Sequence, residues 1–376
     1  MATARKGGMD LLSELTSNIK RDRAGGSKAT AQKITKIFAD VIASDMWLNA
    51  TELMKLIKQM GAKLIAADPM AFYIGNIVKR IAHIIRMQSN NCNVPLYEEK
   101  PKENEENLDN PLMEMDSLNF LIGEENKLDE IPLVKTASSM NDTRAKDPAY
   151  RDFKSNLEES LLEIQTDIEE AYGAISFHCR EQFQDNDTVL TIGYSSTVLE
   201  LFKDAKEKSD FTVVVAENSP ENSGKTMQKR LSSLGIKTIL LADTSIFSYM
   251  SKINKVIIST RAIMADGGLI TDAGVELAVL AADYHTVPVI VVSALYKLTP
   301  LYPFDNTTYN KIVSPKTVLN SKECKFGEKV DVIVAKYDYI EPEYISLYIT
   351  NVGCHTPHYI YREFAEYYSK EELHKV

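Results

Sequence analysis

Six short apolar runs recur between residues 188 and 349, and the stretches between them are long enough to form helices. The runs are continuous and rich in valine and isoleucine, which is typical of strands buried on both faces of a parallel sheet. Right-handed crossover connections then join successive strands. We therefore predict a Rossmann-like α/β domain over 151–376, with helices covering a mostly parallel sheet. The predicted strands are TVLTI at 188–192, FTVVV at 211–215, KTILL at 237–241, KVII at 255–258, VPVIVV at 287–292 and YISLYI at 344–349, and the crossover helices lie within 195–208, 221–234 and 273–284.

Residues 1–88 carry a helical pattern instead. Isoleucine and valine recur at positions 74, 77, 78, 81, 84 and 85, which is the spacing of one helix face. Pro69 separates this helix from a preceding one, because proline lacks an amide proton and disfavours helix in the residue before it. We expect an N-terminal helical domain over 1–88.

The segment 89–150 changes in composition. Between Glu98 and Glu130 there are twelve Asp or Glu residues and three Lys residues. Such a stretch cannot bury enough apolar surface to fold by itself. We expect an acidic linker over 89–150, either a mobile, solvated connection or an acidic docking segment.

The overall charge of the chain indicates its classes of partner. A formal net charge of −10 disfavours direct binding of nucleic acid, which depends on Lys and Arg contacts to phosphates.

No apolar run approaches the roughly 20 residues that cross a bilayer, and the N-terminus lacks a secretory signal pattern. The four cysteines show no CxxC spacing, which argues against zinc and against a disulfide framework. We expect a cytoplasmic protein without membrane contact, metal or cofactor.

Ligands of a parallel sheet bind beyond the carboxyl ends of its strands. The first strand ends at Gly193, but neither a GxGxxG nor a GxxxxGK[ST] pattern is present, so a nucleotide phosphate loop is not predicted. Ser195 and Ser196 can cap the helix that follows, and no base accompanies them as it would a nucleophile. Asp243 precedes an apolar helix in an N-cap pattern, and Arg261 follows the fourth strand.

The segment SALYKLTPLYPFD at 293–305 follows the fifth strand. Aromatic, leucine and proline residues stand where a soluble monomer would carry polar turn residues. This composition predicts either burial against another chain or packing onto the same domain. The candidate interface residues are Tyr296, Lys297, Leu298, Pro300, Tyr302, Pro303, Phe304 and Asp305.

Several segments together resemble the alpha, beta and delta subunits of eukaryotic translation initiation factor 2B, and within that family the beta subunits. They are DPMAFYIGNIVKRI at 68–81, VLTIGYSSTV at 189–198, DTSIFSYMSKINKVII at 243–258, ALYKLTPLYPFD at 294–305 and NVGCHTPHYIYR at 351–362. The resemblance implies a non-catalytic regulatory subunit of the guanine-nucleotide exchange factor for initiation factor 2. It implies pairing with a delta subunit through the α/β domains, and assembly with alpha, gamma and epsilon subunits, of which epsilon carries the exchange activity. It also implies that the N-terminal helical domain helps bind the alpha subunit of initiation factor 2.

The same fold is similar to that of ribose-1,5-bisphosphate and methylthioribose-1-phosphate isomerases. The resemblance places their catalytic cysteine at Gly193 and their aspartate at Arg261, and neither residue can serve as a proton-transfer group. Gly193, Asp243, Arg261 and Asn351 are then expected to line a vestigial pocket. A sugar-phosphate isomerase or a metabolite-binding module remains the alternative function, and an enzyme would have to use Asp243 or Glu217 instead.

Overall fold

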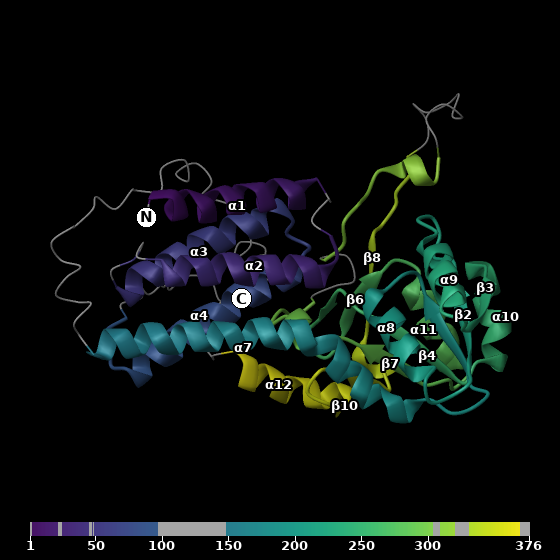
Figure 1. The fold of residues 1–376 in the computed structure, drawn as a ribbon. Coiled ribbons are helices and arrows are strands. Elements are labelled where there is room, and N and C mark those ends of the chain that lie inside the picture. Colours follow the sequence, from purple (N-terminus) through teal and green to yellow (C-terminus); the bar gives the residue numbers. More distant parts are fainter. Residues whose placement is uncertain are drawn as a thin grey trace, which may run out of the picture. The chain divides into compact units, whose positions relative to one another are not determined.

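The computed structural model describes residues 2–21, 25–44, 47, 49–96, 148–303, 309–319 and 331–368. The chain divides into two compact units, Met1–Glu169 with Glu366–Val376, and Glu170–Ala365 (Figure 1). It passes from the first unit to the second within the long helix α7 (Pro148–Cys179). The acidic segment 98–130 lies outside the described residues. Within the described part of the chain, no helix has the length and apolar character needed to span a membrane.

The first unit is helical, as the sequence predicts. The face of α4 that carries the isoleucine pattern is buried at Ile74, Ile77, Val78, Ile81 and Ile85. Packing against α3 is close, because a Cβ added at Gly61 would lie 2.6 Å from Cγ1 of Val78. Among the described residues, the helices of this unit that precede α7 are α1 (Ala2–Lys20), α2 (Ser27–Ala43), α3 (Ala50–Ala67) and α4 (Phe72–Asn91).

The second unit is built on a seven-stranded sheet in the order β10-β9-β7-β4-β1-β2-β3. Neighbouring strands are parallel except β10 and β9, so the predicted mostly parallel sheet is confirmed. The central strands are buried on both faces, as the apolar runs indicate. The strands are β1 (Thr188–Ile192), β2 (Thr212–Ala216), β3 (Lys237–Leu241), β4 (Lys255–Ser259), β7 (Val289–Val292), β9 (Leu347–Ile349) and β10 (Cys354–His355).

Helices occupy each of the predicted crossover stretches (Figure 1). They are α8 (Ser196–Ala205), α9 (Ser223–Ser233) and α11 (Val275–Tyr284). The shorter α10 (Ile246–Tyr249) packs against α11, and α12 (Ile360–Tyr367) follows β10. Short 3-10 helices lie at Arg180–Gln182, Asp243–Ser245, Met250–Lys252, Leu295–Lys297, Pro315–Thr317, Pro342–Tyr344 and Pro357–Tyr359.

A second, antiparallel sheet was not predicted from the sequence. It consists of β5 (Ala262–Ile263), β6 (Leu269–Asp272) and β8 (Tyr337–Ile340), in that order. The residues just before β8 pair with residues 309–313 to form a two-stranded ribbon. In this ribbon Ile312 lies opposite Ala335. This ribbon extends the small sheet beside the carboxyl ends of the main strands, and its residues help to line the cleft described below.

Candidate functional site

The turn after β1 is closed by the loop that follows β2. Gly193 has a φ of +64°, in the left-handed region that favours glycine. A Cβ at this position would lie 2.8 Å from the Ser223 Oγ and 3.0 Å from the Asn218 Nδ2. Ser195 caps α8, because its Oγ accepts a hydrogen bond from the Val198 amide at 3.4 Å, as predicted. The positive φ therefore favours glycine at this corner, and a side chain here would have to displace the tips of Ser223 and Asn218.

Asp243 holds the loop after β2 in place. Its two carboxylate oxygens accept hydrogen bonds from the backbone amides of Asn218 at 3.0 Å and Ser219 at 2.6 Å. The expectation that Asp243 caps its own following helix is wrong, because its side chain makes no such capping bond there. The neighbouring loop presents two backbone donors to the carboxylate. These two bonds engage both oxygens, which disfavours Asp243 as a substitute proton-transfer group.

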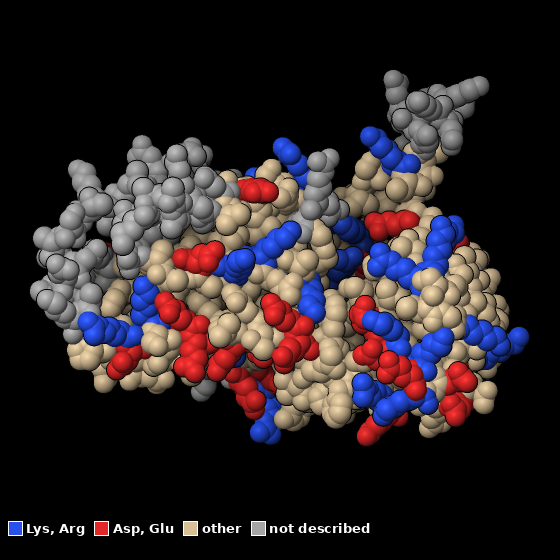
Figure 2. All heavy atoms as spheres, in the orientation of Figure 1, with Lys and Arg blue, Asp and Glu red and all other residues tan. Residues whose placement is uncertain are grey.

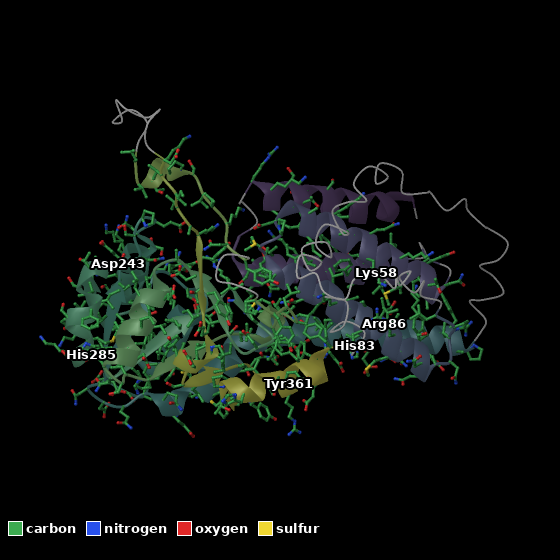
Figure 3. The ribbon with its side chains drawn as sticks, turned by 180° about the vertical axis from the view of Figure 1, so that it is seen from behind. Lys58, His83, Arg86, Asp243, His285 and Tyr361 are labelled. Carbon is green, nitrogen blue, oxygen red and sulfur yellow. The ribbon has the colours of Figure 1, made fainter. Side chains whose placement is uncertain are left out.

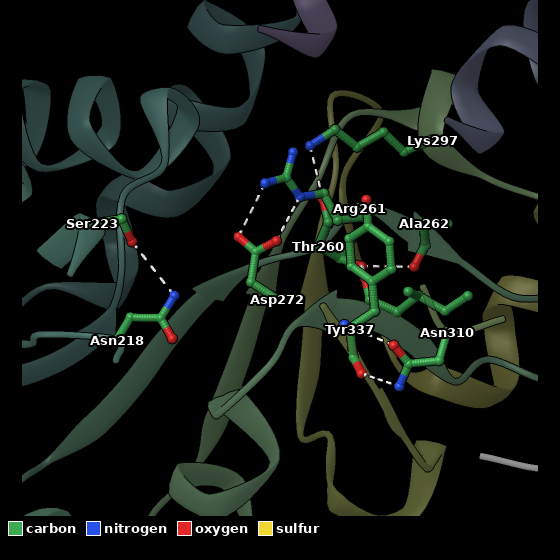
Figure 4. A network of polar contacts seen from close by, with 10 residues as sticks. Asn218, Ser223, Thr260, Arg261, Ala262, Asp272, Lys297, Asn310 and Tyr337 are labelled. Carbon is green, nitrogen blue, oxygen red and sulfur yellow. Dashed lines mark hydrogen bonds and ion pairs between the residues drawn. The ribbon is translucent and has the colours of Figure 1, made fainter. Parts of the chain in front are cut away.

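A polar network joins the ends of β4 and β6 to the segment after β7 (Figure 4). The Arg261 guanidinium donates to both oxygens of Asp272, at 2.9 and 3.1 Å. The buried Lys297 ammonium donates to the main-chain oxygen of Thr260 at 2.8 Å. Burial lowers the pKa of Lys297 to about 8, and the adjacent positive charge of Arg261 acts in the same direction.

A cleft of about 220 Å³ lies between the loop after β2 and the ribbon. Asn218 and Asp272 both line this cleft. Asn218 lies next to Gly193 and donates to Asp243, and Asp272 pairs with Arg261, so the cleft is next to three of the four predicted pocket residues. Glu221 and Lys336 also face the cleft. It is smaller than most small-molecule sites, which span roughly 300–1,000 Å³. Its lining has mixed charge, because Glu221 and Asp272 are accompanied by Lys336, and Asp272 is ion-paired with Arg261.

Asn351, the fourth predicted pocket residue, has a different position. Its side-chain oxygen accepts a hydrogen bond from the backbone amide of Leu295 at 2.9 Å. Asn351 thereby anchors the start of the segment 295–303. It does not line the cleft.

The segment 295–303 packs largely onto its own unit. Tyr296, Lys297, Leu298 and Pro300 are buried within this chain, in agreement with the second of the two alternatives for this segment. The backbone of Thr299 donates to the Ile263 oxygen at 2.8 Å, which fixes the segment on β5.

Tyr302 is 45% exposed, and Pro303 beside it is partly exposed. Phe304 and Asp305 lie outside the described residues. Contact with another chain therefore remains a prediction that concerns Tyr302 and Pro303 among the described residues.

One face of the described residues carries mixed charge. On the face shown in Figure 2, Lys and Arg side chains are interspersed with Asp and Glu over both units. Binding to a phosphate backbone uses basic side chains gathered on one face. Among the described residues, no group of three or more His, Cys, Asp or Glu side chains is arranged to hold a metal ion.

Comparison with known proteins identifies the family. The profile of the Initiation factor 2 subunit family matches residues 23–357. This chain belongs to that family. It is 33% identical over 366 residues to "Translation initiation factor eIF2B subunit beta" of Dictyostelium discoideum, and the match covers 95% of this chain and 94% of the relative. It is also 29% identical over 180 residues to "Ribose 1,5-bisphosphate isomerase" of Pyrococcus furiosus, which covers 47% of this chain and 56% of that enzyme.

Solved structures of the family share the fold over nearly the whole chain. The crystal structure of eIF2B beta from Chaetomium thermophilum has a TM-score of 0.71 at 24% identity, covering 99% of this chain and 97% of that one. A chain of the tetrameric eIF2B-beta2-delta2 complex from C. thermophilum has a TM-score of 0.69 at 22% identity, covering 98% of this chain and 97% of that one. N-terminal helices followed by a mostly parallel sheet are therefore the shared architecture.

Proposed function

We propose that this chain is a non-catalytic, beta-type regulatory subunit of the guanine-nucleotide exchange factor eIF2B, acting in translation initiation. The observation that carries the proposal is the extent of the match to a beta subunit, which continues over 366 residues and through both units. The match to the isomerase covers about half of this chain. The longer sequence match, at higher identity, favours the subunit over the enzyme.

The α/β unit supports a role without catalysis. Gly193 lies in a corner that the loop after β2 fills, and Arg261 is held by Asp272. Arginine stays protonated at physiological pH and cannot act as a general base. Asp243 already accepts two backbone hydrogen bonds. None of these three residues is arranged to exchange a proton with a sugar.

The proposed partners follow from this role. The chain pairs with a delta-type subunit through its α/β unit, and Tyr302 and Pro303 contribute to that contact. The alpha, gamma and epsilon subunits of eIF2B join the assembly, and epsilon supplies the exchange activity. The N-terminal helices help to bind the alpha subunit of initiation factor 2, in the cytoplasm. The tetrameric beta2-delta2 complex of C. thermophilum supports the pairing with delta.

Co-expression with the delta-type subunit of the same organism tests this proposal. We expect the two chains to co-elute on size exclusion and to give a heteromer in native mass spectrometry. Together with the gamma and epsilon subunits, they should accelerate release of labelled GDP from initiation factor 2. A chain that stays monomeric beside delta and leaves the exchange rate unchanged would contradict the proposal.

A turnover assay tests the enzymatic alternative separately. The purified chain is given ribose 1,5-bisphosphate or methylthioribose 1-phosphate, with an authentic isomerase as the positive control. We expect no product from this chain. Product formed by the chain and lost in Asp243→Asn would show that a proton-transfer group has been retained.

A further inference from the structure

One helix of the α/β unit is apolar on both of its faces. The inner face of α11 buries Val275, Ala278, Val279 and Ala282. Its outer face exposes Leu277 by 64%, Leu280 by 42% and Tyr284 by 73%. Positions three, four and seven apart lie on the same side of a helix, so these three side chains form one row. The solvent-facing side of a surface helix normally carries polar residues, so three large apolar side chains there are unusual.

An aromatic residue of α10 widens this row. The Phe247 ring is 52% exposed, and its centre lies 5.1 Å from the ring centre of Tyr284. We call Phe247, Leu277, Leu280 and Tyr284 the α11 stripe. Single exposed apolar side chains are common on protein surfaces, whereas a contiguous cluster of large ones marks an interaction site.

The end of the stripe also carries an unsatisfied polar atom. The His285 ring lies 5.1 Å from that of Phe247, and its Nε2 is buried without a hydrogen-bond partner in this chain. Figure 3 shows His285 at the outer side of the α/β unit. Buried polar atoms normally have a partner, so this one is an exception at the end of the stripe.

Carboxylates gather along one side of the stripe. Glu276 and Asp283 lie on α11 seven residues apart and therefore share a side, next to Leu280. The 3-10 helix Pro342–Tyr344 packs against α11 and adds Glu341 and Glu343. Burial raises the pKa of Glu276, and the nearby charges of Asp338 and Glu341 act in the same direction. We call Glu276, Asp283, Glu341 and Glu343 the acidic flank.

We propose that the α11 stripe and the acidic flank together bind a basic amphipathic helix of another protein. The apolar face of that helix packs along Leu277, Leu280 and Tyr284, and its Lys or Arg side chains meet the acidic flank. A second copy of this chain fits less well, because its net charge is −10 and a symmetric contact repeats the same surface on both sides. The proposal rests on α10, α11 and the Pro342–Tyr344 turn, and is independent of pairing with a delta subunit.

Binding of a model peptide to the full-length chain tests the apolar part of the surface. The probe is a fluorescein-labelled peptide of leucine and lysine, about five helical turns long, with leucine on one face and lysine on the other. Fluorescence anisotropy should show saturable binding. Leu277→Ser and Tyr284→Ser should each weaken it by about tenfold or more. The matched control Leu162→Ser, at a position that is 62% exposed on α7, should leave it unchanged.

The charge of the probe tests the acidic flank. A peptide with the same leucine face but glutamate in place of lysine should bind at least about tenfold more weakly, and added salt should weaken the lysine peptide. Asp283→Lys should also reduce binding of the lysine peptide, whereas Glu207→Lys at an exposed position outside the flank should not. Far-UV circular dichroism checks that each variant is folded.

Three results would overturn the proposal. One is equal binding of the lysine and glutamate peptides. Another is binding that ignores Leu277→Ser and Tyr284→Ser in folded protein. The third is concentration-dependent self-association, seen by sedimentation velocity of the chain alone and abolished by Leu277→Ser, which would assign the stripe to a second copy.

Discussion

The ammonium group of Lys297 donates to the main-chain oxygen of Thr260 across 2.8 Å, although the Lys297 side chain is buried. Burial disfavours the charged form of lysine, and the neighbouring Arg261 guanidinium adds a second positive charge. The pKa of Lys297 falls to about 8 from its ordinary value of 10.5. The segment after β7 is thus held by an amine that can lose its proton near neutral pH.

Replacing Lys297 by methionine should change how stability depends on pH. Between about pH 8 and 10.5 the unfolded wild-type chain holds a proton on Lys297 that the folded chain has released, so wild-type stability rises with pH relative to Lys297→Met. We expect a relative gain on the order of 2 kcal/mol across this window. Urea unfolding followed by circular dichroism, between about pH 7 and pH 10, measures it.

The exposed Lys208 provides the matched control for this pH dependence. Lys208→Met should follow the wild-type curve throughout the same range. Parallel curves for wild type and Lys297→Met would show that the buried amine keeps its ordinary pKa.

Asp243→Asn should loosen the loop after β2. In asparagine an NH2 group, which is a donor, replaces one of the two accepting oxygens, and the charge is lost, so the pair of bonds from the Asn218 and Ser219 amides is not reproduced. We expect a loss of about 1–3 kcal/mol in the free energy of unfolding, and faster hydrogen exchange at these two amides. Asp283→Asn, at an exposed position on α11, should change stability by less than about 0.5 kcal/mol. Equal effects of the two substitutions would remove this role from Asp243.

The main sheet could be predicted because its strands carry a local signal. Each is a continuous apolar run, and β1 and β3 begin and end at the residues expected from the sequence. The small antiparallel sheet gives no such signal. β5 has two residues, and β8 pairs with β6 across a long separation in sequence, from Leu269 to Ile340. Pairing of that kind depends on the completed fold.

The site divides in the same way. The Ser195 cap follows from its immediate neighbours and was predictable, whereas the residues that close the corner at Gly193 lie on another loop. The partners of Asp243 lie 24 and 25 residues away on another loop, so its N-cap pattern was misleading. Lys297 lies in a segment rich in leucine and proline, a composition that is equally typical of a subunit interface and of a domain core. The contacts of this segment with Thr260 at the end of β4 and with Ile263 of β5 place it in the core of its own unit, and these contacts cannot be read from the sequence.

Gly193→Ala should destabilise the α/β unit. Alanine at this position would have to adopt a φ of +64°, which is unfavourable for a residue with a side chain. Its Cβ would also lie too close to the side chains of Ser223 and Asn218, which would have to shift. We expect a cost of about 1–3 kcal/mol in the free energy of unfolding, measured by urea titration. Gly173→Ala in α7, where a Cβ meets nothing within 4 Å, should instead stabilise by roughly 0.5–1 kcal/mol. A neutral Gly193→Ala variant would mean that the corner can open to admit a side chain.

Tyr302→Ala tests whether the exposed end of the segment 295–303 contributes to subunit pairing. The Tyr302 ring is 45% exposed in this chain. Aromatic side chains that a partner covers often contribute a large part of the binding free energy. If it anchors the proposed contact with a delta-type subunit, its removal should weaken assembly by about 2 kcal/mol or more. Phe304→Ala should act in the same direction. Phe177→Ala removes an aromatic ring of α7 that is at least as exposed, and should leave assembly unchanged. Dissociation constants from sedimentation velocity of the mixed subunits provide the comparison, and unchanged assembly in both Tyr302→Ala and Phe304→Ala would remove this segment from the interface.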